Sequence, residues 1–183
     1  MTETQKILGI VGSPRRNGNT EVLVDEVLKG AEEAGAQVEK VILNELDIRP
    51  CQACNNCYKT GKCTHDDDMT ELFDKMEKAD AWVLGTPVYW FGPTAQFKVF
   101  IDRWYHPRHK KFKGKRVILV IPLGDKNENI ARHTVGMITD SLNFLRIKIF
   151  KTLLAPGINR RGVVRENTNL LSEAAIAGKD III

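Results

Sequence analysis

Five short runs of apolar residues recur along the chain, at residues 6–12, 37–43, 81–87, 115–122 and 148–156. Three of them, at 6–12, 81–87 and 115–122, are almost continuously apolar, which is the pattern of a strand buried on both faces of a parallel sheet. The run at 37–43 alternates apolar and polar residues, which is typical of a strand near a sheet edge. The pattern therefore predicts five strands.

Segments with helical periodicity lie between these runs. In residues 23–34 apolar side chains recur at spacings of three and four, and Gly35 then suits the C′ position of a helix. Residues 69–77 place their large apolar side chains on one helical face, with Asp68 as the N-cap. Further helices are expected over 94–105, within 129–145 and over 166–177.

The alternation of strands and helices predicts an α/β fold with a doubly wound parallel sheet. Right-handed crossovers leave few topologies, and the flavodoxin-like strand order 2-1-3-4-5 fits best. At 183 residues the chain has the size of one domain, so we expect a single domain over 1–183. Such sheets bind ligands at the carboxyl ends of the strands, where the strand order reverses. The loops after the first, third and fourth strands therefore form the candidate site.

The loop after the first strand, GSPRRNGNT at residues 12–20, is rich in groups that bind phosphate. It has neither the GK[ST] ending of a Walker A loop nor a G-x-G-x-x-G pattern, so a nucleoside triphosphate or a dinucleotide is not its obvious ligand. Two glycines let backbone amides converge, and the following helix points its N-terminus at the same place. We predict a phosphate site; the alternative is a plain turn with an Asn or Thr helix cap. The candidate residues are Ser13, Arg15, Asn17, Asn19 and Thr20.

The loop after the third strand carries three consecutive aromatic residues between Pro87 and a Gly–Pro pair. Because the aromatics are consecutive, no single face of an element can bury them all. Aromatic side chains in a loop suit a flat ring system, which gains stacking area at low entropic cost. The loop therefore predicts a planar ligand. Its candidate residues are Pro87, Val88, Tyr89, Trp90 and Phe91.

All four cysteines fall within the loop 51–63, with the spacing C-x2-C-x2-C-x5-C. The chain shows no signal peptide and no apolar run of about 18 residues, so we expect a cytoplasmic protein without a membrane span, where disulfides are rare. Zinc sites usually join two ligand pairs across a longer gap, whereas C-x2-C-x2-C is the compact chelate of ferredoxin-type 4Fe–4S sites. The spacing favours a cluster, with zinc and unmetallated thiols as alternatives. The candidate ligands are Cys51, Cys54, Cys57 and Cys63.

The net charge of +4 is mild, and most of the excess lies in the basic segment 103–116. Aromatic residues among these charges would suit nucleic acid. We interpret the segment instead as a solvated connection between two core elements.

The two loops together resemble the NAD(P)H-dependent FMN reductase superfamily of flavodoxin-like proteins. The resemblance rests on GSPRRNGNT and on PVYWFGPTAQFKVFIDR at residues 87–103. It implies that FMN is bound, with its phosphate held by the first loop through Ser13, Arg15, Asn19 and Thr20. Pro87, Val88, Tyr89 and Trp90 would line the isoalloxazine, and Phe91 follows them. Where the family often has a Gly-rich turn after the fourth strand, this chain has a single glycine, Gly124, as the third contact.

Within that superfamily, the iron–sulfur flavoproteins carry a compact cysteine motif after the second strand, which the four cysteines match position by position. The resemblance implies an oxidoreductase in which a 4Fe–4S cluster exchanges electrons with FMN, in a dimer or tetramer that brings the cluster of one subunit near the FMN of another. Ferredoxin or a similar one-electron carrier would be the electron donor.

Two alternatives remain. Reductases of the superfamily that have no established cluster often carry a tail like GKCTHDDDM at residues 61–69, so the chain could be an NAD(P)H-dependent reductase of flavins or quinones. A metal-binding module that contacts nucleic acid through residues 103–116 is the remote alternative.

Overall fold

The computed structural model describes residues 4–182 and shows one five-stranded sheet, in which all neighbouring strands are parallel. The strand order is β2-β1-β3-β4-β5, which confirms the predicted flavodoxin-like topology. Residues 1–3 and 183, which belong to the expected domain of 1–183, lie outside the described part. The strands are β1 (Lys6–Val11), β2 (Gln37–Ile42), β3 (Ala81–Gly85), β4 (Arg116–Pro122) and β5 (Lys148–Ala155).

The predicted helices are present within a few residues of their expected bounds. The α-helices are α1 (Asn19–Glu33), α2 (Asn56–Thr60), α3 (Met69–Lys78), α4 (Ala95–Asp102), α5 (Arg132–Phe144) and α6 (Thr168–Asp180). Short 3-10 helices connect them: η1 (Leu43–Glu45), η2 (Arg103–Tyr105), η3 (Pro107–Phe112), η4 (Glu128–Ala131) and η5 (Val163–Glu166). The sequence did not predict α2, because its five residues, NCYKT, are too few to show an apolar periodicity.

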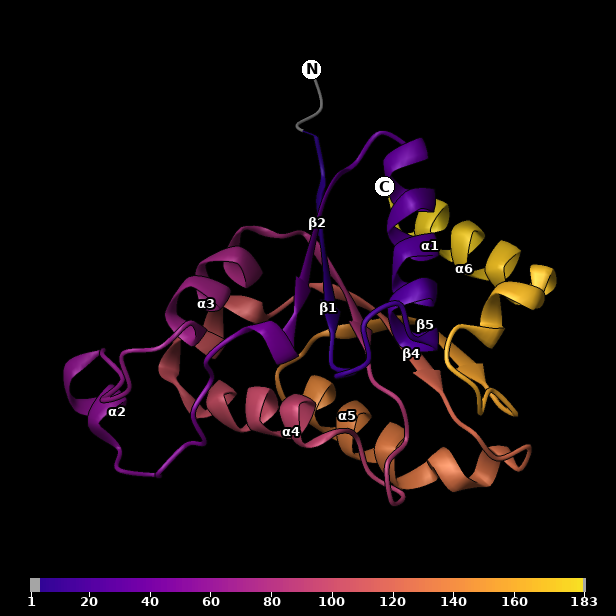
Figure 1. Ribbon diagram of the computed structural model, residues 1–183. Coiled ribbons are helices and arrows are strands. Elements are labelled where there is room, and N and C mark those ends of the chain that lie inside the picture. The colour runs from indigo at the N-terminus through magenta and orange to yellow at the C-terminus, as the bar shows by residue number, and fades with distance from the viewer. Residues whose placement is uncertain (1–3, 183) are drawn as a thin grey trace.

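Helices cover both faces of the sheet. Figure 1 shows α1 and α6 together on one face and α3, α4 and α5 on the other. Successive strand side chains point to opposite faces, so Leu8 and Ile10 of β1 enter one core, whereas Ile7 and Val11 enter the other. This double burial explains the continuous apolar runs. No helix of residues 4–182 has both the length and the apolar character that a bilayer crossing requires.

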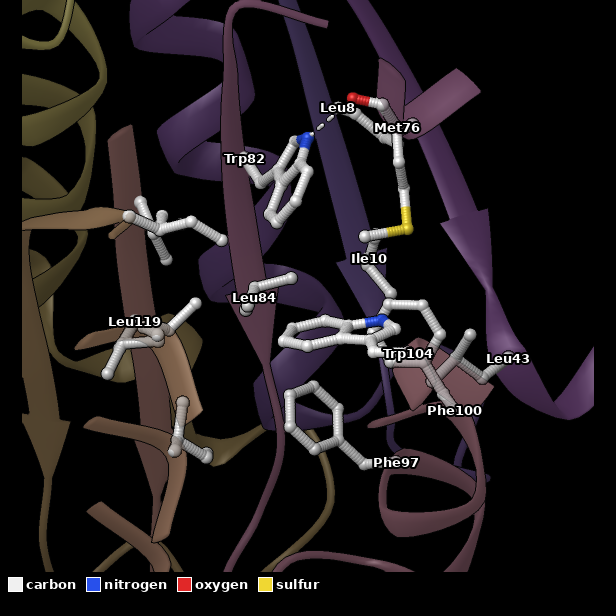
Figure 2. Close-up of a cluster of buried hydrophobic side chains, with 14 of the residues drawn as sticks. Leu8, Ile10, Leu43, Met76, Trp82, Leu84, Phe97, Phe100, Trp104 and Leu119 are labelled. Atoms are coloured by element: carbon white, nitrogen blue, oxygen red, sulfur yellow. Dashed lines mark hydrogen bonds between the residues drawn. The ribbon is translucent and has the colours of Figure 1, made fainter. Parts of the chain in front are cut away.

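The core under α3, α4 and α5 combines aliphatic side chains with a group of buried aromatic rings (Figure 2). Trp82 of β3 is fully buried and donates its indole N–H to the carbonyl oxygen of Met76, 3.1 Å away. Phe100 and Trp104 meet edge to face, with ring centroids 5.2 Å apart. Burial of each such ring contributes roughly 1.5–3 kcal/mol, so this face fixes α4 firmly against the sheet.

The opposite core depends on a close approach of α1 and α6. A Cβ atom on Gly30 would lie 1.9 Å from the carbonyl oxygen of Ala175, and one on Gly178 would lie 1.9 Å from that of Val27. The two backbones can pack this closely only because each helix presents a glycine at the contact.

The interpretation of residues 103–116 as a solvated connection is wrong for part of the segment, because Lys110, Lys111 and Lys113 are exposed but other side chains enter the core. Trp104 is 4% exposed, and Phe112 is fully buried against the edge of Trp82, with ring centroids 4.8 Å apart. The Arg108 guanidinium binds the carboxylates of Asp74 and Glu77 on α3. The prediction failed because these acidic partners come from a different element and are invisible in the basic segment itself.

Candidate functional site

A cavity of about 210 Å³ opens at the carboxyl ends of β1, β3 and β4, the place predicted for the ligand. Eight of the residues predicted to bind the cofactor line it, whereas Asn17, Trp90 and Phe91 do not. The lining residues are Ser13, Arg15, Gly18, Asn19, Thr20, Pro87, Val88, Tyr89, Pro122, Leu123, Gly124, Ile158, Asn159 and Arg161.

The phosphate loop, residues 12–18, ends directly in the N-terminus of α1. Gly18 is the N-cap residue, and no side chain caps the helix, so the first backbone amides of a 15-residue helix remain available at the cavity. The Ser13 hydroxyl accepts a hydrogen bond from the Arg15 N–H at 3.2 Å, which curls the loop. The loop therefore has the geometry of an anion site.

Glu21 binds the backbone of this loop, a role that the sequence analysis did not predict. Its carboxylate accepts the Asn17 N–H at 2.5 Å and binds Lys40 Nζ at 3.0 Å. Burial raises the pKa of Glu21, but hydrogen bonds from Lys40 and from the Asn17 amide, with the charges of Lys40 and Arg16, outweigh it and hold that pKa below its ordinary value. Glu at the third helical position is one half of a capping box, but the N-cap is Gly18 and the amide that Glu21 accepts belongs to Asn17, so no complete capping-box signal was present in the sequence.

Asn19 binds a second loop rather than pointing free side-chain donors into the cavity. Its amide nitrogen donates to the Arg160 carbonyl at 2.8 Å, and its amide oxygen accepts the Val164 N–H at 3.2 Å. This contact holds the loop between β5 and α6 so that Asn159 and Arg161 reach the cavity. The sequence reasoning missed both, although the polar stretch INRRG directly after the fifth strand was a signal.

Thr94 joins the phosphate loop to the aromatic loop, residues 86–94. The Thr94 hydroxyl donates to the carbonyl of Gly12 at 2.5 Å and accepts the Phe97 N–H at 3.2 Å as the N-cap of α4. Thr94 is fully buried. One hydroxyl thus fixes the two predicted cofactor loops against each other.

Trp90 and Phe91 form a tight two-residue turn outside the cavity. Tyr89 and Gly92 exchange two backbone hydrogen bonds of 2.8 and 3.0 Å across it. Both turn residues have left-handed φ angles, +47° and +65°, which bulky side chains rarely adopt. Trp90 is 96% exposed. The structure therefore brings Pro87, Val88 and Tyr89 to the cavity and leaves these two aromatics at its outer edge.

The cysteine loop, residues 51–63, carries α2 and projects past α3 and α4, away from the sheet (Figure 1). Tyr58 of α2 packs on Tyr105 of η2, with ring centroids 5.3 Å apart. All four thiols are free; Cys54 is exposed, and the other three are half-buried. Ala53 and Asn55, on either side of Cys54, have left-handed φ angles of +52° and +59°. Within residues 4–182, no three His, Cys, Asp or Glu side chains are grouped so that they would hold a single metal ion.

The sulfur atoms nevertheless receive hydrogen bonds from their surroundings. Cys63 Sγ lies 3.4 Å from both Arg103 Nη2 and the His65 backbone nitrogen, and Cys54 Sγ lies 3.6 Å from the Thr64 hydroxyl. Both sulfur atoms thus lie beside polar groups that come from outside residues 51–63.

Two of these thiols have shifted pKa values. A backbone amide at Asn56 and then the Thr64 hydroxyl lower the pKa of Cys54. Burial, followed by charge interactions with Cys63 and then Cys51, raises the pKa of Cys57.

A buried ion pair anchors the end of this loop. Arg103 donates two hydrogen bonds to the Asp67 carboxylate, at 2.5 and 3.1 Å, and one to the carbonyl of Arg49 at 2.8 Å. The Asp67 side chain is fully buried. The neighbouring Asp68 occupies the predicted N-cap position of α3, but its carboxylate accepts the Asp47 N–H instead of capping the helix.

A family model described as NADPH-dependent FMN reductase matches residues 5–147. The chain belongs to this family. The match includes both cofactor loops and all four cysteines, and it ends before β5. The membership confirms the resemblance seen in the sequence and supports a flavin-dependent oxidoreductase.

Several curated relatives in this family are iron–sulfur flavoproteins. The one from Methanocaldococcus jannaschii is 45% identical over 98 residues, which are 54% of this chain and 51% of the relative. The one from Methanosarcina thermophila is 35% identical over 136 residues, 74% of this chain and 71% of the relative. The chain spans about half of the length of the M. jannaschii relative.

Two solved structures of oxidoreductases share the fold. An NAD(P)H:quinone oxidoreductase from Methanothermobacter marburgensis superposes with a TM-score of 0.79 at 19% identity, over 99% of this chain and 98% of its own. An FMN-dependent NADH-azoreductase from Bacillus anthracis, in complex with FMN, gives 0.77 at 15% identity, over 98% of this chain and all of its own.

Proposed function

We propose that this chain is an FMN-dependent oxidoreductase that binds FMN at the carboxyl ends of β1, β3 and β4. The observation that carries the proposal is the cavity itself, which combines an uncapped helix N-terminus, two arginines and a flat apolar wall in a chain of the FMN reductase family. FMN would supply hydride and single-electron chemistry, while the protein binds, orients and shields it.

The phosphate end of the site lies in the loop 12–18. The hydroxyls of Ser13 and Thr20, the backbone amides at the start of α1 and the guanidinium of Arg15 would hold the phosphate. Arg161 adds a second positive charge from the loop after β5. Asn19 acts here by holding that loop rather than by touching phosphate.

The ring end is the wall made by Pro87, Val88 and Tyr89, with Gly124 facing it from the loop after β4. These residues offer apolar and aromatic surface for one side of a planar ring. The turn at Trp90 and Phe91 would border the outer edge of the ring.

We propose further that Cys51, Cys54, Cys57 and Cys63 hold a 4Fe–4S cluster, which would carry one electron at a time. The names of the relatives, the hydrogen-bond donors around the sulfurs and the strained backbone support this. A left-handed alanine costs about 1–2 kcal/mol, and such strain is typical of ligand-binding loops. Each iron of a 4Fe–4S cube binds one cysteine thiolate, so the four sulfur atoms need not converge on the position of a single metal ion.

The cysteine loop packs on η2, with Tyr58 against Tyr105, and none of its residues lines the cavity. Electron transfer between subunits of a homodimer or homotetramer, with a ferredoxin-like donor, is therefore part of the proposal. A cluster-free NAD(P)H-dependent reductase of flavins or quinones is the second candidate, favoured by the description of the family model. Nucleic-acid binding is disfavoured because Arg103 and Arg108 are already paired with carboxylates.

FMN binding is tested by titrating the flavin into apoprotein and following its fluorescence. Arg161→Gln should weaken binding severalfold, because Arg161 lines the cavity. Arg160→Gln removes the same charge from the neighbouring exposed position and should have little effect. Apoprotein that takes up no FMN would overturn the whole proposal.

The cluster is tested on protein prepared without oxygen. We expect about four irons and four sulfides per chain. Cys57→Ser should lose the iron and keep the FMN, because the cofactor cavity is built by other loops. If the protein contains one zinc per chain and no sulfide, the four cysteines form a zinc site and not a cluster. Rapid flavin reduction by NADPH, and none by reduced ferredoxin, would favour the second candidate.

A further inference from the structure

Two sequence motifs that lie far apart in the chain meet in one buried ion pair. Asp67 belongs to the stretch GKCTHDDDM that closes the cysteine loop, and Arg103 ends the stretch PTAQFKVFIDR that contains α4. Their contact is bidentate, at 2.5 and 3.1 Å, and the Arg103 side chain is only 4% exposed. Since the flavin cavity uses neither side chain, the cofactor loops do not account for this pair.

The third contact of Arg103 points to its role. Its Nη2 atom lies 3.4 Å from Cys63 Sγ and donates a hydrogen bond to it. The guanidinium thus places a full positive charge, shielded from water, beside one of the four thiols. The other sulfur contacts in the loop come from neutral groups, the His65 amide and the Thr64 hydroxyl.

We propose that Arg103 is a positioning residue that sets the reduction potential of the cluster on the four cysteines, with Asp67 as the opposing charge. This inference rests on the cluster proposed above. Reduction adds one negative charge to a cluster and its thiolates, so a nearby cation and an N–H donor stabilise the reduced form and raise the potential. Both effects are strong where water is excluded.

The pair predicts opposite effects for its two members. Replacing Arg103 by a neutral residue removes the cation and leaves Asp67 negative, so the potential should fall. Asp67→Asn removes the opposing charge, while its amide oxygen can still accept from the guanidinium, so the potential should rise. A pair that only held the fold together would shift the potential in the same direction in both variants, or not at all.

The experiment measures the midpoint potential of the cluster by redox titration monitored with electron paramagnetic resonance, alongside iron and sulfide content. The variants are Arg103→Gln and Asp67→Asn. Lys98→Gln is the matched control, because it removes a cation that is paired with an exposed carboxylate on α4. We expect the midpoint potential to fall in Arg103→Gln, to rise in Asp67→Asn and to stay unchanged in Lys98→Gln. If Arg103→Gln does not fold, the change in midpoint potential of Asp67→Asn still tests the role of the ion pair.

The outcomes separate the two proposals. Wild-type protein that contains no iron or sulfide when prepared anaerobically would overturn both the cluster and this role of Arg103. Wild-type protein with a cluster whose potential does not rise in Asp67→Asn would overturn the role of Arg103 alone and leave the proposed function standing.

Discussion

Replacement of Thr94 by valine should weaken the fold and the flavin site together. Valine has nearly the shape of threonine, so the change removes the hydroxyl without opening a cavity. Two hydrogen bonds are lost. In one the Thr94 hydroxyl donates to the Gly12 carbonyl at 2.5 Å, and in the other it accepts the Phe97 N–H at 3.2 Å. Both lie in the buried region where the phosphate loop meets the aromatic loop.

The magnitude follows from what each loss leaves behind. An unsatisfied buried carbonyl costs about 1–3 kcal/mol, and loss of an N-cap acceptor costs about 0.5–2 kcal/mol. We therefore expect the free energy of unfolding to fall by about 2–4 kcal/mol. With a urea dependence of about 2 kcal/mol per molar, the midpoint should move down by about 1–2 M.

Urea unfolding of the apoprotein, followed by circular dichroism, measures this loss, and FMN titration measures the second effect. FMN affinity should also fall, because Gly12 is no longer held to the aromatic loop. Thr94→Ser is the control, since it keeps the hydroxyl and loses only a methyl group. If the valine variant matches the serine variant in stability, the reasoning about this hydroxyl is wrong.

Three further predictions concern other parts of the fold. Gly178→Ala should lower the thermal midpoint, because overpacking against α1 typically costs about 1–3 kcal/mol. Gly136→Ala in α5 is the control: a Cβ there has no neighbour within 4 Å, so the midpoint should rise slightly. Similar midpoints for the two variants would contradict the close contact between α1 and α6. Trp90→Asn should raise the free energy of unfolding by about 1 kcal/mol in urea, because asparagine tolerates the left-handed backbone and the exposed indole packs on little; a loss of stability would show that the turn is not strained. Glu21 has a lowered pKa in the fold, so its carboxylate stabilises the protein above the unfolded pKa of about 4.3, and this contribution is lost as the pH falls through the folded pKa. Glu21→Gln should therefore be less stable than the wild-type protein at pH 7, and a stability difference that does not shrink below about pH 4 would refute the linkage.

The strands and the place of the cavity could be predicted because each follows from a local pattern. A strand covered on both faces must be apolar at every position, and Ile7 to Val11 show this directly. Once the strand order is known, the carboxyl ends of β1 and β3 identify the loops that matter. The residues Ser13, Pro87 and Tyr89 then follow from their places in those loops.

The rest depended on contacts between distant segments. Arg161 reaches the cavity because contacts with distant residues hold the loop after β5, among them the Asn19 amide and the Arg16 carbonyl, and no local pattern reports those bonds. Trp90 lies outside the cavity because of a left-handed turn that its sequence, Trp–Phe, does not predict. Arg103 looked like a surface charge because its partner Asp67 lies 36 residues earlier in the chain.

The close contact between α1 and α6 also has a consequence for how the chain acquires its structure. During synthesis α1 emerges well before α6, the last helix described, which covers the side of α1 that carries Gly30, whereas the inner side of α1 packs on the sheet. The side that faces α6 is therefore covered only after all five strands have been made, and such long-range contacts make folding slow. Until then this surface is open to chaperones or to other nascent chains, so a substitution at Gly30 should reduce the yield of folded protein in the cell more than its equilibrium stability suggests.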